Sequence, residues 1–217
     1  MDSRRERLQR ARLYFVTDVQ PGLEELLAAA LSGGVDMVQL RDKSAGDDEL
    51  VEAAAVFRRL CDEHGALFWL NDRPDLVDAC RADGVHVGQD DMPASTARAA
   101  AGPDVLVGLS THSPAQLDAA LAERVADQLS VGPVWETPTK EGRPAAGLRY
   151  VEHAASVAGD CPWFAIGGID LDNVREVIAA GASRVVVVRA IRDADDPRAA
   201  ASSLRDALEE ASVGTES

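Results

Sequence analysis

The stretch Met37-Val38-Gln39-Leu40-Arg41-Asp42-Lys43 joins a short apolar run to a group of charged residues. Four mainly apolar residues of this kind fit a strand that is buried on both faces, as in a parallel sheet. Similar runs recur along the chain at intervals of roughly 25 residues, and each is followed by polar or small residues. The strands predicted in this way span residues 13–16, 37–40, 67–70, 84–87, 106–108, 128–131, 163–166 and 184–188.

Segments rich in alanine and leucine, with apolar residues at helical spacing, lie between these runs. The predicted helices span residues 23–31, 48–64, 74–80, 95–101, 114–122, 148–158, 171–180 and 198–210. Alternating strands and helices indicate the α/β class and a parallel sheet with right-handed crossovers. The regular alternation favours a single (β/α)8 TIM barrel, with a doubly wound open sheet as the alternative.

The chain has 217 residues and contains no linker-like stretch. We therefore expect one barrel domain over residues 1–217, with residues 1–11 and 212–217 as flexible or peripheral ends. Three widely spaced cysteines, with no C-x-x-C pair, fit reduced thiols rather than a disulfide framework. No apolar signal region follows the charged N-terminus, and no apolar run approaches the ~18 residues of a membrane span. These features predict a cytoplasmic protein.

The net charge is −15, which disfavours binding to nucleic acid or to an anionic membrane. An anionic small molecule would instead need locally concentrated cations. Lys43 and Lys140 are the only lysines among 22 basic residues, and each follows an apolar run. Lysine supplies a mobile point charge, and arginine a planar bidentate donor. With Gln39 and Arg41 on the same side of an extended segment as Lys43, the pattern predicts a phosphate site.

Carboxylates follow two consecutive strands, in Asn71-Asp72-Arg73 and in Gly88-Gln89-Asp90-Asp91. Because neighbouring parallel strands lie about 5 Å apart, Asp72 and Asp91 could converge on one cation. Mg²⁺ accepts a few protein oxygens completed by water and substrate phosphate. As the alternative, Asp72 caps the next helix and Asp90 or Asp91 shapes the turn before Pro93.

Further polar or glycine-rich stretches follow the remaining strands. Ser110 and His112 come after the fifth predicted strand. Ser113, which directly precedes Pro114, fits a helix N-cap. The long loop 132–144 after the sixth fits an active-site lid. In a barrel, Gly167-Gly168 and Val188-Arg189 would lie where loops commonly bind phosphate.

Six motifs, taken together, resemble the thiamine phosphate synthase family over residues 13–191. They are Gln39-Leu40-Arg41-Asp42-Lys43, Asn71-Asp72-Arg73, residues 84–93, Ser110-Thr111-His112, Thr137-Pro138-Thr139-Lys140 and residues 165–169. The resemblance implies a (β/α)8 barrel that condenses 4-amino-2-methyl-5-(diphosphooxymethyl)pyrimidine with 4-methyl-5-(2-phosphooxyethyl)thiazole. The products would be thiamine phosphate and pyrophosphate, with Mg²⁺ as cofactor and small molecules as the only partners. A homo-oligomer stays open.

The resemblance also implies roles for individual residues. It assigns the metal to Asp72 and Asp91, and catalysis to Arg41, Lys43, Ser110 and Lys140. The implied substrate-binding residues are Gln39, Leu40, Arg41, Asp42, Lys43, Asn71, Ser110, Thr137, Pro138, Thr139, Lys140, Gly167, Gly168, Val188 and Arg189.

One residue departs from the family pattern, since Arg189 stands where the family usually has serine. Three alternatives on a similar barrel also stay open. The first is a thiazole tautomerase that uses a histidine such as His112, and the second is a noncatalytic barrel that senses a phosphorylated metabolite. The third is an unrelated sugar-phosphate isomerase, which the Gly-Gly loop alone does not exclude. The presence of Asp72, Asp91 and the cationic loops favours the synthase, because the tautomerase would not need them.

Overall fold

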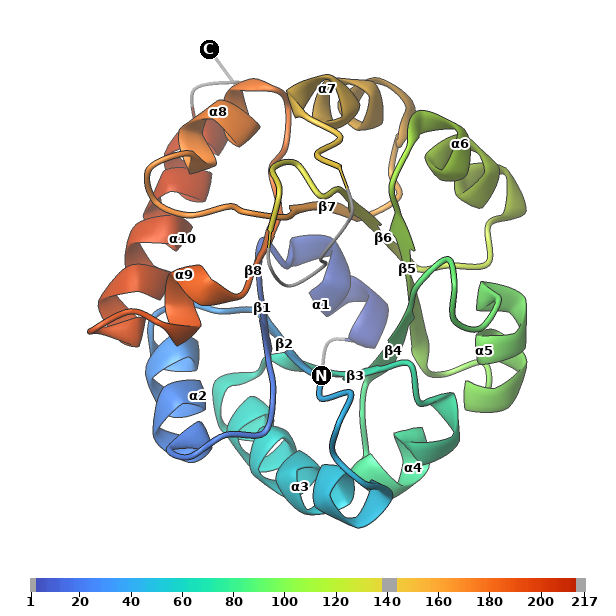
Figure 1. Cartoon of the computed structure of the whole chain (residues 1–217), viewed down its shortest axis with the longest axis vertical. Coiled ribbons are helices and arrows are strands. Elements are labelled where there is room, and N and C mark those ends of the chain that lie inside the picture. Colours follow the sequence, from blue (N-terminus) through green and yellow to red (C-terminus); the bar gives the residue numbers. More distant parts are fainter. Residues whose placement is uncertain (1–2, 138–143, 214–217) are drawn as a thin grey trace.

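The computed structural model describes residues 3–137 and 144–213, and in it the strands close into one parallel barrel in chain order (Figure 1). The strands are β1 (Leu13–Thr17), β2 (Met37–Leu40), β3 (Leu67–Asn71), β4 (Gly84–Val87), β5 (Leu106–Thr111), β6 (Gln128–Val131), β7 (Trp163–Ile166) and β8 (Val185–Val187). Closure comes from parallel pairing of β8 with β1, where Phe15 lies opposite Val187. The predicted TIM barrel is confirmed, and the open sheet is wrong.

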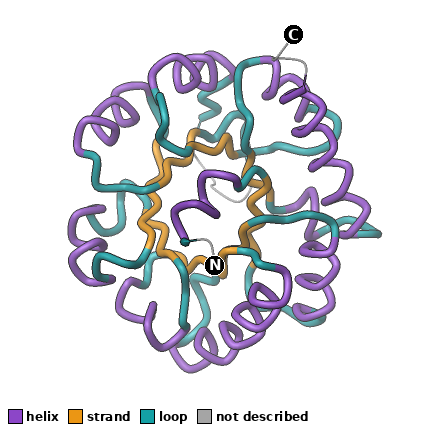
Figure 2. The backbone as a smooth tube through the Cα atoms, turned by 180° about the vertical axis from the view of Figure 1, so that it is seen from behind, coloured by secondary structure: helices purple, strands orange, loops and turns teal. Residues whose placement is uncertain are grey.

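Apart from α1, the helices surround the barrel (Figure 2). The helices are α1 (Arg4–Arg10), α2 (Leu23–Ser32), α3 (Asp47–His64), η1 (Pro74–Leu76), α4 (Val77–Cys80), α5 (Ala94–Ala101), α6 (Pro114–Glu123), α7 (Leu148–Val157), α8 (Val174–Ala179), α9 (Arg189–Arg192) and α10 (Pro197–Val213). α1 and α9 were not expected from the apolar periodicity. Within the described residues, no helix is long and apolar enough to cross a membrane.

Successive strand residues face two different cores, which explains why the strands read as continuous apolar runs. Residues such as Phe15 and Leu40 point outward and pack beneath the helices. Tyr14, Trp69 and Phe164 point inward and fill the barrel centre. The ring of Tyr14 lies 6.1 Å from that of Trp69 and 5.7 Å from that of Phe164, so aromatic packing occupies the middle of the barrel.

The segment before β1, expected as a flexible or peripheral end, contains a helix that lies across one end of the barrel (Figures 1 and 2). α1 begins with a capping box, in which the Ser3 hydroxyl accepts from the Glu6 amide and the Glu6 carboxylate accepts from the Ser3 amide. Leu8 is buried and packs into the interior core. The helix therefore covers the amino-terminal end of the strands and leaves the carboxyl-terminal end for ligands.

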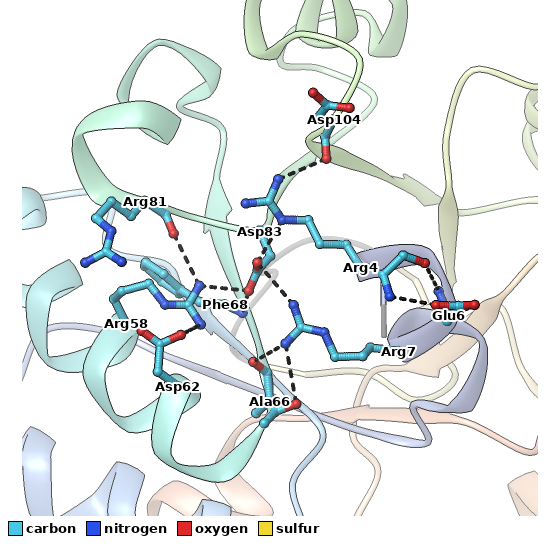
Figure 3. Close-up of polar contacts among 12 residues, drawn as sticks. Arg4, Glu6, Arg7, Arg58, Asp62, Ala66, Phe68, Arg81, Asp83 and Asp104 are labelled. Carbon is cyan, nitrogen blue, oxygen red and sulfur yellow. Dashed lines mark hydrogen bonds and ion pairs between the residues drawn. The ribbon is translucent and has the colours of Figure 1, made fainter. Parts of the chain in front are cut away.

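Three aspartates that precede alternate strands repeat one arrangement at this covered end. Asp36, Asp83 and Asp127 stand directly before β2, β4 and β6. Each carboxylate accepts an amide N–H at the start of the preceding strand, from Leu13, Phe68 and Val107 respectively. Each also pairs with at least one arginine from the surrounding helices. Figure 3 shows the Asp83 cluster, in which Arg4 and Arg7 of α1 also pair with the carboxylate.

Candidate active site at the carboxyl-terminal end of the strands

Two carboxylates and one ammonium group come together at the open end of the barrel. The Lys43 Nζ lies 3.9 Å from the Asp72 Oδ2, across the ends of β2 and β3. Burial raises the pKa of Asp72, and the neighbouring negative charge of Asp91 raises it further. The structure thus brings Asp72, Asp91 and Lys43 together, as the sequence predicted, from loops after three consecutive strands.

Backbone hydrogen bonds set the positions of both carboxylates. Asp72 has a positive φ of 60°, and its amide donates to the His86 carbonyl at 2.8 Å. The Asn71 side-chain amide donates to the Asp72 Oδ2 at 2.6 Å. The Asp91 Oδ2 accepts from the Gly88 amide at 3.1 Å. The local fold therefore holds Asp72 and Asp91 side by side against their mutual repulsion.

The pairing of Asp72 with Asp91 suits a divalent cation, because a cation between the two carboxylates would remove their repulsion. The described residues contain no group of three or more histidine, cysteine, aspartate or glutamate side chains suited to a metal. A metal at Asp72 and Asp91 would take its remaining ligands from other oxygens. Mg²⁺ commonly keeps water and substrate phosphate in this way.

The end of β2 and the segment after it contain both site residues and scaffold residues. Gln39 is buried inside the barrel, where its side-chain amide donates to the Tyr14 hydroxyl at 2.5 Å. Arg41 is half-buried at the mouth, and its guanidinium pairs with none of the described residues. The Leu40 side chain packs in the outer core, so only its backbone faces the mouth.

The Asp42 carboxylate has a structural task in the same loop. Its Oδ1 accepts from the Ser44 amide at 2.8 Å, from the Ser44 hydroxyl at 2.7 Å and from the Ala45 amide at 3.0 Å. These hydrogen bonds, led by the one from the Ser44 side chain, lower the pKa of Asp42. The carboxylate shapes the turn that carries Lys43, and a ligand would meet the backbone of this loop.

β5 extends to Thr111, beyond its predicted end at residue 108, so Ser110 lies within the strand and only His112 follows it, and their surroundings differ. Ser110 is buried at the top of the barrel interior, and its Oγ lies 2.9 Å from the His86 Nε2. The Nδ1 of His112 donates to the Gly132 carbonyl at 2.6 Å, since a carbonyl can only accept. Ser113 is the expected N-cap of α6 and accepts from the Gln116 amide.

A cavity of about 310 Å³ opens beside β7 and β8. Its walls include Thr137, Gly168 and Arg189, all three predicted as substrate-binding, together with Asp170 and Asp193. Six backbone N–H groups along the two loops donate no hydrogen bond within the described part of the chain. They belong to Gly167, Gly168, Ile169, Val188, Arg189 and Ala190. Unpaired amides of this kind suit an anion such as phosphate.

Gly168 is required by the shape of this cavity wall. Its φ is +68°, and a Cβ there would lie 3.0 Å from the Trp135 Cβ. The Gly168 carbonyl accepts from the Asn173 side-chain amide at 2.8 Å, which fixes the loop. Any larger residue would strain the backbone and press on the segment after β6.

Three predicted site residues, Pro138, Thr139 and Lys140, lie outside the described residues, as does most of the predicted lid. Conversely, sequence reasoning missed His86 and Gln89, which contact Ser110. The Gln89 side-chain amide donates to the Ser110 carbonyl at 2.8 Å. The signal for His86 was its alternation with Gly84 on β4, which places its side chain on the inner face.

Comparison with known proteins adds to this geometry. The family described as thiamine monophosphate synthase matches residues 13–191. A thiamine-phosphate synthase of Streptomyces avermitilis is 53% identical over 203 residues, which cover 92% of this chain and 94% of that protein. The thiamine-phosphate synthase of Saccharopolyspora erythraea is 52% identical over 213 residues, with coverage of 94% and 96%.

Solved structures agree with these sequence matches. A structure described as thiamine phosphate pyrophosphorylase from Pyrococcus furiosus superposes with a TM-score of 0.86 at 35% identity, covering 95% of this chain and 98% of that one. A 3-hexulose-6-phosphate synthase structure from Salmonella typhimurium has a TM-score of 0.67 at 19% identity, with coverage of 92% and 99%. At that identity the likeness concerns the fold alone.

Proposed function

The chain belongs to the thiamine monophosphate synthase family and is a transferase of thiamine biosynthesis, and we propose that it condenses the pyrimidine diphosphate with the thiazole phosphate named above. The observation that carries this proposal is the meeting of Asp72, Asp91 and Lys43 at the same barrel mouth as the cavity around Gly168. One half of the mouth suits a diphosphate with its cation, and the other suits a phosphate monoester.

The proposed reaction is dissociative. The bond between the pyrimidine methylene carbon and the diphosphate oxygen breaks, and its electron pair leaves with the diphosphate. The thiazole nitrogen then donates its lone pair to the methylene cation and forms the new carbon–nitrogen bond. Neither step needs a protein nucleophile. Because negative charge grows on the leaving group, cations fixed beside it lower the barrier.

Arg41 and Lys43 are placed to supply that charge. The Arg41 guanidinium, which pairs with none of the described residues, can donate two parallel hydrogen bonds to a diphosphate. The Lys43 ammonium lies at the loose distance of 3.9 Å from Asp72 and is mostly exposed. It can therefore shift toward a bound anion at little cost. Lys140 is proposed for the same task, and Asn71 and Gln39 for orienting the pyrimidine.

Asp72 and Asp91 would hold Mg²⁺. When bound, the metal supplies Lewis-acid stabilisation of the departing diphosphate. The chain's own contribution is to keep the two carboxylates together, through the amides of residues 72 and 88 and the Asn71 side chain. The raised pKa of Asp72 shows the electrostatic cost of that arrangement, which a cation would offset.

The thiazole phosphate would bind in the cavity between β7 and β8. Six unpaired amides line its wall, but Asp170 and Asp193 also lie there and would repel a dianion. Arg192 pairs with Asp193 at 2.7 Å and offsets one of these charges. Arg189 is the remaining cation of the wall. Its guanidinium has no hydrogen bond or ion pair with the described residues, although, beside the hydrogen bond from Arg192, its charge helps to lower the pKa of Asp193. In this chain the guanidinium would replace the family's serine as an attractive partner of the phosphate.

The proposed setting is the cytoplasm. The three cysteines are free thiols, and Cys61 and Cys80 are buried. Burial raises the pKa of Cys61 to about 12, so this thiol stays protonated and unreactive at neutral pH. Such thiols are ordinary in a reducing compartment.

The test combines the purified protein with both phosphorylated substrates, with and without Mg²⁺. Thiamine phosphate and pyrophosphate should form in equal amounts, and only when both substrates and the metal are present. Each single-substrate reaction is a control. Rearrangement of the thiazole alone, without pyrophosphate release, would instead support the tautomerase and refute this proposal. Binding without any turnover would support the sensor.

A further inference from the structure

His86 lies beneath the diphosphate half of the candidate site and contacts both Ser110 and Asp72 there. Its imidazole is inside the barrel, with the residue 7% exposed. The Nε2 lies 2.9 Å from the Oγ of Ser110 on the next strand, and its own carbonyl accepts the Asp72 amide at 2.8 Å. One residue thus joins the proposed diphosphate site to the proposed metal site.

A glycine makes this contact geometrically available. Gly108 lies opposite His86 in the pairing of β4 with β5, two residues before Ser110 on the same inner face. A Cβ at Gly108 would lie 2.5 Å from the His86 Nδ1 and 2.5 Å from the Gln128 Oε1. Because no side chain fills that position, the imidazole can lie across β5 and reach the hydroxyl of Ser110.

The backbone of Ser110 is held as well. Its carbonyl accepts from the Gln89 side-chain amide at 2.8 Å, and Ser110 lies opposite Ser130 in the pairing of β5 with β6. With backbone and carbon skeleton fixed, the rotation of the hydroxyl is the remaining freedom of this side chain. With Nε2–H as the donor to Oγ, the imidazole restricts this rotation and leaves the hydroxyl hydrogen for an anionic acceptor.

We propose that His86 is a positioning residue, which fixes the Ser110 hydroxyl in the orientation that the pyrimidine diphosphate requires. This inference rests on the proposed function, since Ser110 is assigned there to the pyrimidine diphosphate. A hydroxyl that is already oriented loses no rotational entropy on binding, and it offers the substrate one defined partner. His86 acts through Ser110 and not on the substrate itself.

A double-mutant cycle between His86 and Ser110 tests this inference. The variants are His86→Leu, Ser110→Ala and the combination, and the readouts are the dissociation constant of the pyrimidine diphosphate by titration calorimetry and kcat/KM. We expect His86→Leu to raise the dissociation constant and to lower kcat/KM by about tenfold each, which corresponds to the loss of one net hydrogen bond. In the Ser110→Ala background the same change should cost less than about twofold, because its target is gone. The KM of the thiazole phosphate should not change.

His86→Gln is the conservative control, since its amide nitrogen can occupy the place of Nε2. It should recover most of the lost affinity, which a purely structural role for the imidazole would not predict. The inference would be overturned if the losses of affinity in the two single variants multiplied in the double variant. It would also be overturned if His86→Gln were as impaired as His86→Leu. Thermal melts of each variant identify misfolded proteins. The binding readout also separates the two proposals: a wild type that binds but does not turn over refutes the synthase only, and one that does not bind refutes both.

Discussion

Replacing Asp83 by asparagine should strongly destabilise the barrel without damaging its chemistry. The Asp83 carboxylate is buried, accepts from the Phe68 amide at 3.0 Å and pairs with Arg58 at 2.9 Å (Figure 3). The Arg58 side chain is itself only 9% exposed. Asparagine keeps the shape of the aspartate and removes its charge, which leaves a buried guanidinium without its main partner.

Removing one member of a buried ion pair costs about 3–5 kcal/mol, because the other charge stays desolvated. For a chain of this length, that corresponds to a fall in melting temperature of roughly 10 °C. The matched control is Asp62→Asn. Asp62 pairs with the same arginine at 2.7 Å, but its side chain is 58% exposed. Loss of an exposed pair should cost less than about 1 kcal/mol.

The difference between wild type and Asp83→Asn should also depend on pH. Burial raises the pKa of Asp83, but hydrogen bonds from Arg58 and Phe68 outweigh it, and the net pKa is lowered from 3.8. A carboxylate with a depressed pKa in the folded state stabilises the protein above its unfolded pKa. The stabilisation should therefore be complete above the pKa of the unfolded state and shrink as the pH falls through the pKa of the folded state.

Denaturant unfolding of the three proteins, with circular dichroism as the signal, measures these free energies. Turnover at a temperature where all are folded should be unchanged, because the site lies at the other end of the barrel. Equal destabilisation by the Asp83 and Asp62 substitutions would refute the reasoning, and so would a loss of turnover in the folded Asp83→Asn variant.

Two further predictions concern the phosphate cavity. Gly168→Ala places a methyl group 3.0 Å from the Trp135 Cβ at a φ of +68°, so the KM of the thiazole phosphate should rise at least about tenfold while the pyrimidine diphosphate binds normally. Steady-state kinetics with each substrate varied in turn check this, and equal effects on both substrates would contradict it. Arg189→Ser removes the unpaired guanidinium, and should weaken thiazole phosphate binding about tenfold and flatten its dependence on salt. Titration calorimetry at several ionic strengths measures this. Arg175→Ser, which removes an exposed arginine paired with Glu210, is the control and should bind as wild type.

The fold was predictable from the sequence because its strands are fully buried. Continuous apolar runs, separated by helical periods of similar length, admit few arrangements other than a closed parallel barrel. α1 and α9 were missed for a physical reason. Each is short, and α1 buries mainly Leu8, so neither produces a clear apolar period.

The sequence predicted those site residues that stand at the carboxyl-terminal ends of the strands. Asp72, Asp91 and Lys43 could be assigned to one mouth because parallel strands end at the same edge. The role of the Asp42 carboxylate could not, since its hydrogen bonds to Ser44 depend on the conformation of the loop. The contact of His86 with Ser110 could not be predicted either, because it depends on how β4 pairs with β5.

The most direct test of the account compares pyrophosphate release by Asp91→Asn and Asp90→Asn in a single turnover, at increasing Mg²⁺ concentration. The two aspartates are neighbours in one loop, and, in addition to burial, it is the charge of Asp91 that raises the pKa of Asp72. If the Asp72–Asp91 pair binds the metal that assists diphosphate departure, Asp91→Asn should lose about 100-fold or more in rate and require more Mg²⁺. Asp90→Asn should resemble wild type. An Asp91→Asn variant with the wild-type rate and metal dependence would contradict the central claim.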